Sequence, residues 1–156
     1  ALDQIRLLPV PDALHFALVS PDMAVPTTAA RAVLPKMIPL RALVDQSGAV
    51  ARLLDALYRS DLPALAAAME SDGIIEPARA HLMARLTEVR AAAKRAGALG
   101  LVISGAGPTL CAICDSRAVA DAAAAAMLAV YDEAGIVATA RATRTSLDGA
   151  RVLSVE

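Results

Sequence analysis

Residues 99–114 read Leu-Gly-Leu-Val-Ile-Ser-Gly-Ala-Gly-Pro-Thr-Leu-Cys-Ala-Ile-Cys, and this stretch decides the fold. Two short apolar runs, 99–104 and 110–114, lie on either side of a loop that contains two glycines and a proline. Short apolar runs bounded by turn residues are typical of buried strands. The stretch therefore predicts a strand, a glycine-rich loop and a second strand.

On both sides of this stretch, short or alternating apolar runs predict further strands, and apolar residues at helical spacing predict several helices. Strands are expected at 14–19 and 136–142, with a last edge strand at 150–155, and helices at 27–34, 40–58, 62–69, 76–96 and 117–134. In the helix at 40–58, the apolar side is formed by Leu43, Val50, Leu53, Leu54 and Leu57. This order of strands and helices predicts a single α+β domain over residues 1–156, with a ferredoxin-like antiparallel sheet and helices packed on one face.

Composition excludes several classes of function. The chain has 156 residues, 57% of them hydrophobic and only 2% aromatic, and a formal net charge of -1. A protein without a basic surface or stacking aromatic side chains is a poor candidate for nucleic-acid binding. No apolar run reaches the roughly 18 residues that cross a membrane, and no export signal is recognisable. We therefore expect a soluble, cytoplasmic protein with neither a nucleic-acid nor a membrane partner.

Two cysteines, Cys111 and Cys114, lie close together in the second apolar run. This position is compatible with reduced thiols in the core, and a Cys-x-x-Cys redox pair is the alternative. A metal site is not expected, because the pair supplies only two ligands and neither His15 nor His81 has the spacing to complete it. His15 is expected to be a packed or edge histidine, and His81 to be solvated.

The glycine loop between the two strands is a candidate anion site. Its glycines permit positive φ angles, so that the amides of Ser104, Gly105, Ala106 and Gly107 could converge on an anion, with the Thr109 hydroxyl beside them. The loop lacks the Gly-Lys-Ser/Thr ending of a P-loop and the third glycine of a dinucleotide-binding fingerprint. The alternative is an ordinary tight connection between strands.

Four segments of the chain resemble motifs of the GHMP kinases, in the form seen in homoserine kinases. Residues 100–109 resemble the third signature motif, residues 26–35 (PTTAARAVLP) a Pro-Thr-x-x-Ala-Arg-x-x-Leu-Pro stretch, residues 76–79 a Glu-Pro-x-Arg segment, and residues 148–153 (DGARVL) the C-terminal ending. They occur in the family's order and span nearly the whole chain. The resemblance implies the C-terminal, substrate-side domain of a kinase that transfers a phosphoryl group from ATP to the hydroxyl of L-homoserine in threonine biosynthesis.

The resemblance also implies roles for two arginines, Arg31 and Arg79, which fall where these kinases hold the amino-acid substrate. A guanidinium can grip a carboxylate through two charge-assisted hydrogen bonds. Without the resemblance, Arg31 would be interpreted as a solvated residue of a short helix. Arg79 would be interpreted as a surface partner of Glu76, three residues earlier.

The main ATP-binding motif of the family, of the type Pro-x-x-x-Gly-Leu-Gly-Ser-Ser-Ala, does not occur in this sequence, which also contains no asparagine. The resemblance therefore implies an N-terminal domain, outside this chain, that binds most of the ATP and Mg²⁺. We expect this chain to be a fragment that is inactive alone, and the family implies a homodimer. Two alternatives remain open: another GHMP kinase with a mevalonate-type or sugar substrate, or a non-catalytic ferredoxin-like module that binds an amino acid.

Two further polar segments are weaker candidates. Residues 45–47, Asp-Gln-Ser, could line a substrate site, although Ser47 has no evident histidine base that would make it a nucleophile. The pair Asp115-Ser116 is expected to cap the helix that follows.

Overall fold

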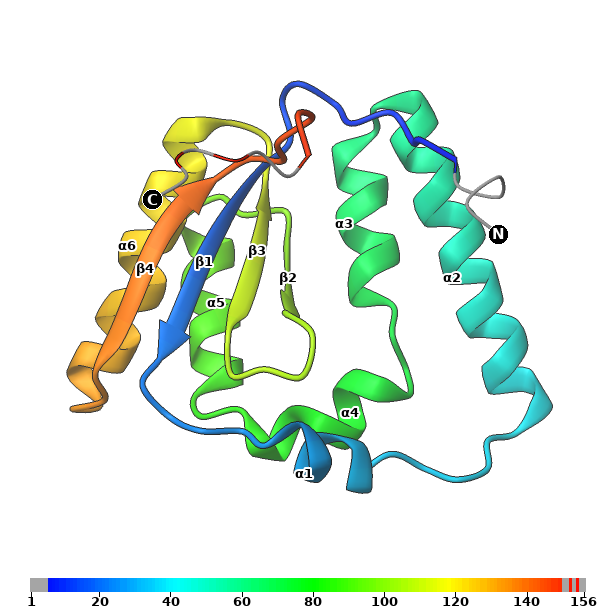
Figure 1. Ribbon diagram of the computed structural model, residues 1–156, viewed down its shortest axis with the longest axis horizontal. Helices are drawn as coiled ribbons and strands as arrows, with labels where there is room; N and C mark the ends of the chain where they lie inside the picture. Colours follow the sequence, from blue (N-terminus) through cyan, green and yellow to red (C-terminus); the bar gives the residue numbers. More distant parts are fainter. Residues whose placement is uncertain (1–5, 150–151, 153, 155–156) are drawn as a thin grey trace.

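The computed structural model of the protein describes residues 6–149, 152 and 154. Within this part the chain forms a four-stranded antiparallel sheet with helices around it (Figure 1). The edge strand expected over 150–155 lies, except for 152 and 154, outside the described residues.

The sheet consists of β1 (His15–Pro21), β2 (Gly100–Ile103), β3 (Leu110–Cys114) and β4 (Ala138–Thr143) in the order β2-β3-β1-β4. All three pairings are antiparallel, and Ala17 of β1 lies between Ala112 of β3 and Ala142 of β4. This is the ferredoxin-like arrangement, in which the two strands beside the glycine loop form a hairpin at one edge. The predicted fold class is confirmed.

The described residues form α1 (Thr27–Ala32), α2 (Leu40–Arg59), α3 (Leu62–Glu70), α4 (Ile75–Arg79), the 3₁₀ helix η2 (Ala80–Leu82), α5 (Leu86–Arg95) and α6 (Arg117–Glu133). Side-chain caps begin two of them, because Asp61 accepts a hydrogen bond from the Ala64 amide and Ser116 accepts one from the Val119 amide. The predicted cap before α6 is therefore confirmed at Ser116. No helix in the described part of the chain is long and apolar enough to span a membrane.

Two apolar clusters hold the layers together. The larger one lies between the sheet and the pair α5 and α6, and its fully buried members include Val19, Leu101, Leu110 and Met127. The smaller one joins α2 and α3 to side chains of the opposite sheet face, including Phe16, Ile113 and Val102. The alternation of side chains along a strand produces these two faces. As a result, α5 and α6 cover one face, while α2 and α3 pack beside β2 and leave the rest of the other face open.

The predicted inward side of α2 is wrong in part. Ala49 and Ala56 are the buried residues of this helix, whereas Leu43, Val50 and Leu54 are exposed. Small side chains allow α2 to approach α3 closely, and this approach turns the larger apolar residues outward.

The single helix predicted over 76–96 is also wrong, because the chain is broken into α4, η2 and α5. At the break Met83 is extended, with φ -100° and ψ 107°, and Arg85 has a positive φ of 58°. Two tertiary contacts stabilise this break. Met83 is buried beside the glycine loop, and the Tyr131 hydroxyl donates a 2.9 Å hydrogen bond to the Ala84 carbonyl.

Candidate active site

The glycine loop between β2 and β3 is held by its own backbone. The Ser104 amide donates to the Thr109 carbonyl at 2.9 Å, and the Gly107 amide donates to the Ser104 carbonyl at 3.0 Å. The expectation that four amides converge on an anion is therefore wrong for Ser104 and Gly107. Gly105 and Ala106 are the two residues of the predicted set for which the described structure shows no amide hydrogen bond.

Both glycines of the loop have positive φ angles, 61° at Gly105 and 82° at Gly107. Their surroundings differ. A methyl group on Gly107 would overlap the side chain of buried Met83, whereas nothing lies within 4 Å of a methyl group on Gly105. Gly107 is therefore favoured by conformation, and the end of the buried Met83 side chain would have to move to admit a methyl group, whereas Gly105 is favoured by conformation alone.

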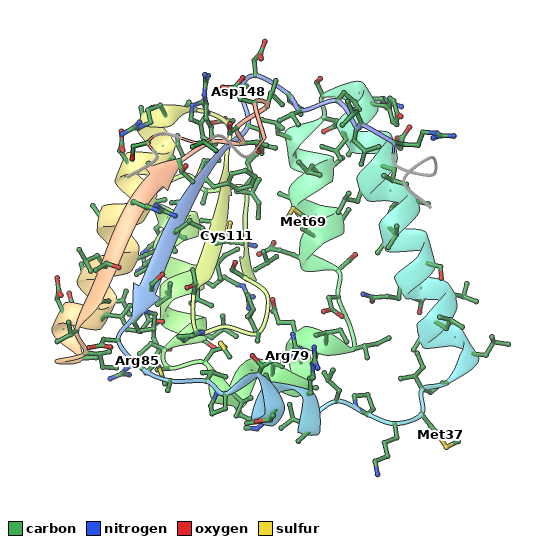
Figure 2. All side chains as sticks on the ribbon, in the orientation of Figure 1. Met37, Met69, Arg79, Arg85, Cys111 and Asp148 are labelled. Atoms are coloured by element: carbon green, nitrogen blue, oxygen red, sulfur yellow. The ribbon has the colours of Figure 1, made fainter. Side chains whose placement is uncertain are left out.

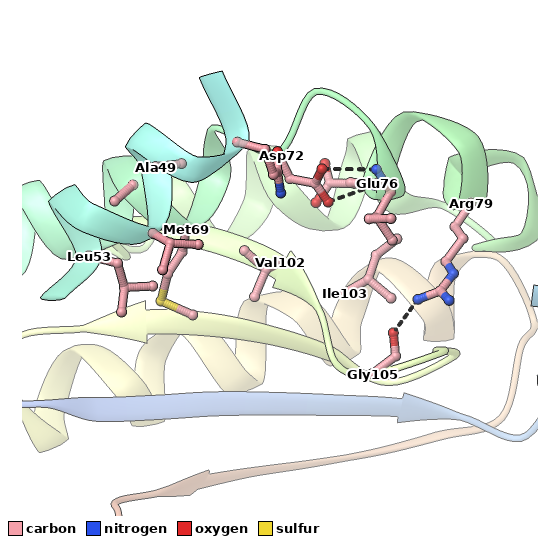
Figure 3. Close-up of a pocket in the computed structure, with 13 residues that line it drawn as sticks. Ala49, Leu53, Met69, Asp72, Glu76, Arg79, Val102, Ile103 and Gly105 are labelled. Atoms are coloured by element: carbon pink, nitrogen blue, oxygen red, sulfur yellow. Dashed lines mark hydrogen bonds between the residues drawn. The ribbon is translucent and has the colours of Figure 1, made fainter. Parts of the chain in front are cut away.

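A pocket of about 280 Å³ lies between α2, α3, α4 and the end of β2 (Figure 3). One end is apolar and is lined by Leu53, Met69 and Val102. The other end is polar and includes Glu76 and Arg79, so that a small molecule with a charged group could be held in a fixed direction. The volume lies at the low end of the roughly 300–1,000 Å³ typical of ligand pockets, which suits a small substrate.

Arg79 joins the pocket to the glycine loop. Its Nη1 donates a 2.9 Å hydrogen bond to the Gly105 carbonyl (Figure 3), and its Nε donates a 3.0 Å hydrogen bond to the Ala30 carbonyl of α1. These partners are 26 and 49 residues away in the sequence. A guanidinium has five N–H donors, so three remain for a ligand. Arg79 is therefore fixed in place and still able to bind an anion.

Glu76 does not pair with Arg79, which excludes the surface ion pair considered from the sequence. It pairs instead with Nη2 of Arg90, which also donates to the Leu101 carbonyl at 3.2 Å. Glu70 accepts hydrogen bonds from the Leu101 amide and from Lys94. This network joins α3, α4 and α5 to β2, and it holds the polar end of the pocket in position.

Asp72 lines the pocket and has a positioning role that sequence reasoning missed. Its carboxylate accepts hydrogen bonds from the amides of Ile74, Ile75 and Glu76, at 2.9, 2.8 and 2.9 Å. It thereby fixes the start of α4, the short helix that carries Arg79. The signal in the sequence was the Asp-Gly pair that precedes the Glu-Pro-x-Arg segment, although it reads equally well as an ordinary turn.

The other candidate residues are placed less centrally. Arg31 lies on α1 directly after Ala30, with an exposed side chain that does not line the pocket. Of residues 45–47, only Gln46 lines it, and the Ser47 hydroxyl donates to the Leu43 carbonyl. His15 is partly buried at the start of β1 and His81 is exposed in η2, as expected from the sequence.

A second hollow, of about 420 Å³, lies on the open face of the sheet beside the glycine loop. Its lining includes Ser104, Thr109 and Arg141, and the Thr109 hydroxyl is hydrogen-bonded to that of Ser20 at 2.8 Å. Gly105 lines the first hollow, and Ser104 and Thr109 line the second, so both hollows border the glycine loop.

The cysteines lie on opposite faces of β3, since they are three residues apart on a strand. Burial raises the pKa of Cys111 to about 11 and that of Cys114 to about 11. Such thiols stay protonated near neutral pH and are poor nucleophiles. The redox-pair alternative is therefore not supported by this geometry.

A resident metal ion does not fit the described residues, among which no group of three His, Cys, Asp or Glu side chains is arranged as a metal site. The two carboxylates that line the pocket are already engaged, Asp72 by three amides and Glu76 by Arg90. Magnesium is usually bound through carboxylates together with substrate phosphates.

Comparison with known proteins identifies the family. Residues 53–133, which include most of the pocket and the whole glycine loop, match the family described as GHMP kinases C terminal. The chain belongs to the GHMP kinases. The match confirms the resemblance seen in the motifs, and it covers β2, β3 and the helices from α3 to α6.

The chain is similar to several homoserine kinases. The chain is 41% identical over 150 residues to a homoserine kinase of Xylella fastidiosa, which covers 95% of this chain and 46% of that protein. It is 46% identical over 104 residues to a homoserine kinase of Arabidopsis thaliana, covering 67% of this chain and 28% of that protein. A crystal structure of homoserine kinase from Cytophaga hutchinsonii superposes with a TM-score of 0.86 at 35% identity, over 92% of this chain and 46% of that one. The chain therefore spans about half the length, or less, of the relatives it matches.

Proposed function

We propose that this chain is the substrate-side domain of a homoserine kinase, which transfers a phosphoryl group from ATP to the side-chain hydroxyl of L-homoserine. The observation that carries the proposal is Arg79, which lines a small pocket and is hydrogen-bonded to the glycine loop. The likeness to homoserine kinases over 150 residues supports the choice of substrate within the family. The reaction would serve threonine biosynthesis.

In this proposal the substrate carboxylate binds the donors of Arg79 that are not used by Ala30 and Gly105. Charge-assisted hydrogen bonds of this kind are among the stronger polar contacts in proteins. Arg31, on the neighbouring helix α1, supplies a second cation once the substrate is bound. The hydroxyl end of homoserine then points toward the glycine loop, where the phosphoryl donor is held.

In this proposal the glycine loop of this chain lines one side of the nucleotide site. On this side the amides of Gly105 and Ala106, together with the hydroxyls of Ser104 and Thr109, would contact phosphate oxygens. Most ATP contacts and the Mg²⁺ ligands belong to the part of the protein that this chain does not span. Magnesium would supply charge neutralisation of the phosphates.

Two further properties follow from the family likeness and remain part of the proposal. The complete protein is a homodimer, and it acts in the cytoplasm.

The test is a coupled ADP-release assay on the complete protein, with L-homoserine, R-mevalonate and galactose offered as acceptors. The proposal expects turnover with homoserine and a kcat/KM at least about 100-fold lower for the other two, because neither galactose nor R-mevalonate has the α-amino-acid group. Preference for mevalonate or galactose would identify another GHMP kinase. Binding of homoserine without ADP release would identify a non-catalytic amino-acid-binding module.

The isolated chain provides a second measurement. It should release no ADP with homoserine, because the nucleotide contacts lie elsewhere. Turnover by this chain alone would show that the division of labour proposed here is wrong.

A further inference from the structure

A cluster of four charged side chains lies beside the polar end of the pocket. Its members are Glu70 at the end of α3, Glu76 on α4, and Arg90 and Lys94 on α5. Of the four, only Glu76 lines the pocket. The Arg90 side chain is 27% exposed and that of Lys94 is 45% exposed. Arg90 is therefore the more deeply placed of the two cations.

The guanidinium of Arg90 contacts three different elements. Its Nη2 donates to the Glu76 carboxylate on α4 and to the Leu101 carbonyl of β2, and its Nε lies 3.6 Å from Oε1 of Glu70 on α3. The last contact is an ion pair, since the distance is too long for a hydrogen bond. An arginine suits this position because its donors form a rigid planar fork, whereas a lysine ammonium is a single point of charge.

Leu101 is the residue at which the cluster meets the sheet. Among the described strands β2 lies at the edge, so one side of its backbone has no neighbouring strand to bind. The Leu101 amide donates to Glu70 at 2.9 Å, and the Leu101 carbonyl accepts the 3.2 Å hydrogen bond from Arg90. Side chains of α3 and α5 thus satisfy the strand edge. The glycine loop begins at Ser104, three residues further along the chain.

Each element that Arg90 contacts also lines the substrate pocket. α3 contributes Met69, α4 contributes Arg79, both labelled in Figure 2, and β2 contributes Ile103. From Arg79 the contacts run along α4 to Arg90 and along β2 to the glycine loop. They return to Arg79 through its hydrogen bond to the Gly105 carbonyl. Arg90 is therefore a member of a closed circuit that includes the cation of the pocket and the glycine loop.

We propose that Arg90 is a positioning residue for substrate binding, which sets where Arg79 stands relative to the glycine loop. This inference rests on the proposed function, in which Arg79 binds the substrate carboxylate. A cluster that served only to neutralise charge could use ammonium groups, as Lys94 does at 2.7 Å from Glu70. Two hydrogen bonds from one guanidinium nitrogen, to α4 and to β2, instead fix the relative position of these two elements. Binding groups must be held within about 0.5 Å of their productive geometry, so this constraint acts on affinity.

The test measures dissociation constants of L-homoserine and ATP by calorimetry on the complete protein, for wild type and Arg90→Lys. The substitution keeps a positive charge among the carboxylates, so the variant should fold, but an ammonium cannot reproduce the fork that joins α4 to β2. Misplacing a functional group by about 1 Å can cost roughly 100-fold, so Arg90→Lys should bind homoserine at least about tenfold more weakly. ATP affinity should stay within about threefold of wild type. Arg90→Gln is a second variant with the same expectation.

Lys94→Gln is the matched control. Lys94 lies on the same helix and, among the described residues, its ion pair is with Glu70 alone. The side chain is nearly half exposed, so its loss should change homoserine affinity by less than about threefold. Urea denaturation of each variant measures stability separately from binding.

A double variant asks whether Arg90 acts through Arg79. In Arg79→Ala the side chain that Arg90 positions is already gone. Adding Arg90→Lys to this background should therefore change homoserine affinity by less than about threefold, although the single substitution in wild type has the larger effect. A residue that only stabilises the fold would not show this dependence.

Four results would overturn the inference. Homoserine affinity that is unchanged in both Arg90 variants would show that the pocket does not depend on this guanidinium. Equal losses in Arg90→Lys and Lys94→Gln would indicate a general effect of the charge cluster. Additive losses in Arg79→Ala/Arg90→Lys would show that Arg90 acts on another part of the site, and all three results would leave the proposed kinase function standing. A wild-type protein that neither binds nor phosphorylates homoserine would overturn the proposed function as well.

Discussion

Replacement of Gly107 by alanine tests how the glycine loop is held. Gly107 has a φ of 82°, and a methyl group there would overlap buried Met83. The left-handed conformation costs about 1–2 kcal/mol for a residue with a Cβ atom, and overpacking a filled core costs about 1–3 kcal/mol more. We therefore expect Gly107→Ala to lower the free energy of unfolding by roughly 2–5 kcal/mol.

Gly105→Ala is the matched control for this prediction. Its φ of 61° carries the same conformational cost, but nothing lies within 4 Å of the added methyl group. It should lower the free energy of unfolding by only about 1–2 kcal/mol. A double variant, Gly107→Ala/Met83→Ala, should be more stable than the sum of its single effects predicts, because the truncated side chain leaves room for the methyl group.

The assay is urea denaturation of the complete protein, followed by far-ultraviolet circular dichroism. Equal effects of Gly105→Ala and Gly107→Ala would refute the contact with Met83 as the reason for glycine at 107. Strictly additive effects in the double variant would refute it as well, since contact between the two sites is what predicts non-additivity.

Further predictions follow from the cap of α4 and from the thiols. Asp72→Ala removes three hydrogen bonds to amides, whereas Asp61→Ala removes one at the start of α3. Asp72→Ala should lower the free energy of unfolding by about 1–2 kcal/mol and also weaken substrate binding. Asp61→Ala should lower it by about 1 kcal/mol and leave substrate binding unchanged. Equal losses of substrate binding in calorimetric titrations of the two variants would contradict this. Burial raises the pKa of Cys111 and of Cys114 from 9.0 to about 11, so their contribution to stability is complete below pH 9 and is lost as the pH rises toward 11. Between pH 7.5 and pH 10 the urea midpoint of wild type should therefore fall further than that of Cys111→Ala/Cys114→Ala, and parallel declines would contradict it.

Much of the fold could be predicted from local patterns. The hairpin around the glycine loop and the helix at 40–58 were predicted almost to the residue, because strand length, turn residues and helical periodicity agree there. The break within 76–96 could not be predicted in this way, because the local pattern is helical throughout. It depends on contacts of Met83 with Gly107 and of Ala84 with Tyr131, which only the folded chain brings together.

The orientation of α2 was missed for a related reason. The helix has apolar residues on more than one side. Leu53 and Leu57 pack inward as predicted, whereas Leu43, Val50 and Leu54 are exposed. The side that packs is set by the small residues Ala49 and Ala56, which permit close contact with α3. Periodicity alone does not reveal which of two apolar faces finds a partner.

The candidate site was foreseen only in outline. The resemblance pointed to Arg79, but its partners Ala30 and Gly105 are backbone carbonyls, and no side-chain pattern predicts them. The same holds for the roles of Asp72 and Glu76, which depend on amides and on Arg90. The glycines of the loop likewise suggested that the amides of residues 104–107 are all available to an anion. The amides of Ser104 and Gly107 instead form hydrogen bonds within the loop.

The central claim, that Arg79 binds the substrate carboxylate, is tested most directly by comparing L-homoserine with the amino diol in which a CH₂OH group replaces that carboxylate. Their dissociation constants would be measured by calorimetry on the complete protein, wild type and Arg79→Ala, with ATP affinity as the control. Hydrogen bonds to a charged group contribute about 1.5–3 kcal/mol, so wild type should bind homoserine about 10- to 100-fold more tightly than the diol. The account predicts that Arg79→Ala loses most of this preference, with the remainder due to Arg31, while its ATP affinity stays within about threefold of wild type. A variant that still prefers homoserine as strongly as wild type does would contradict it.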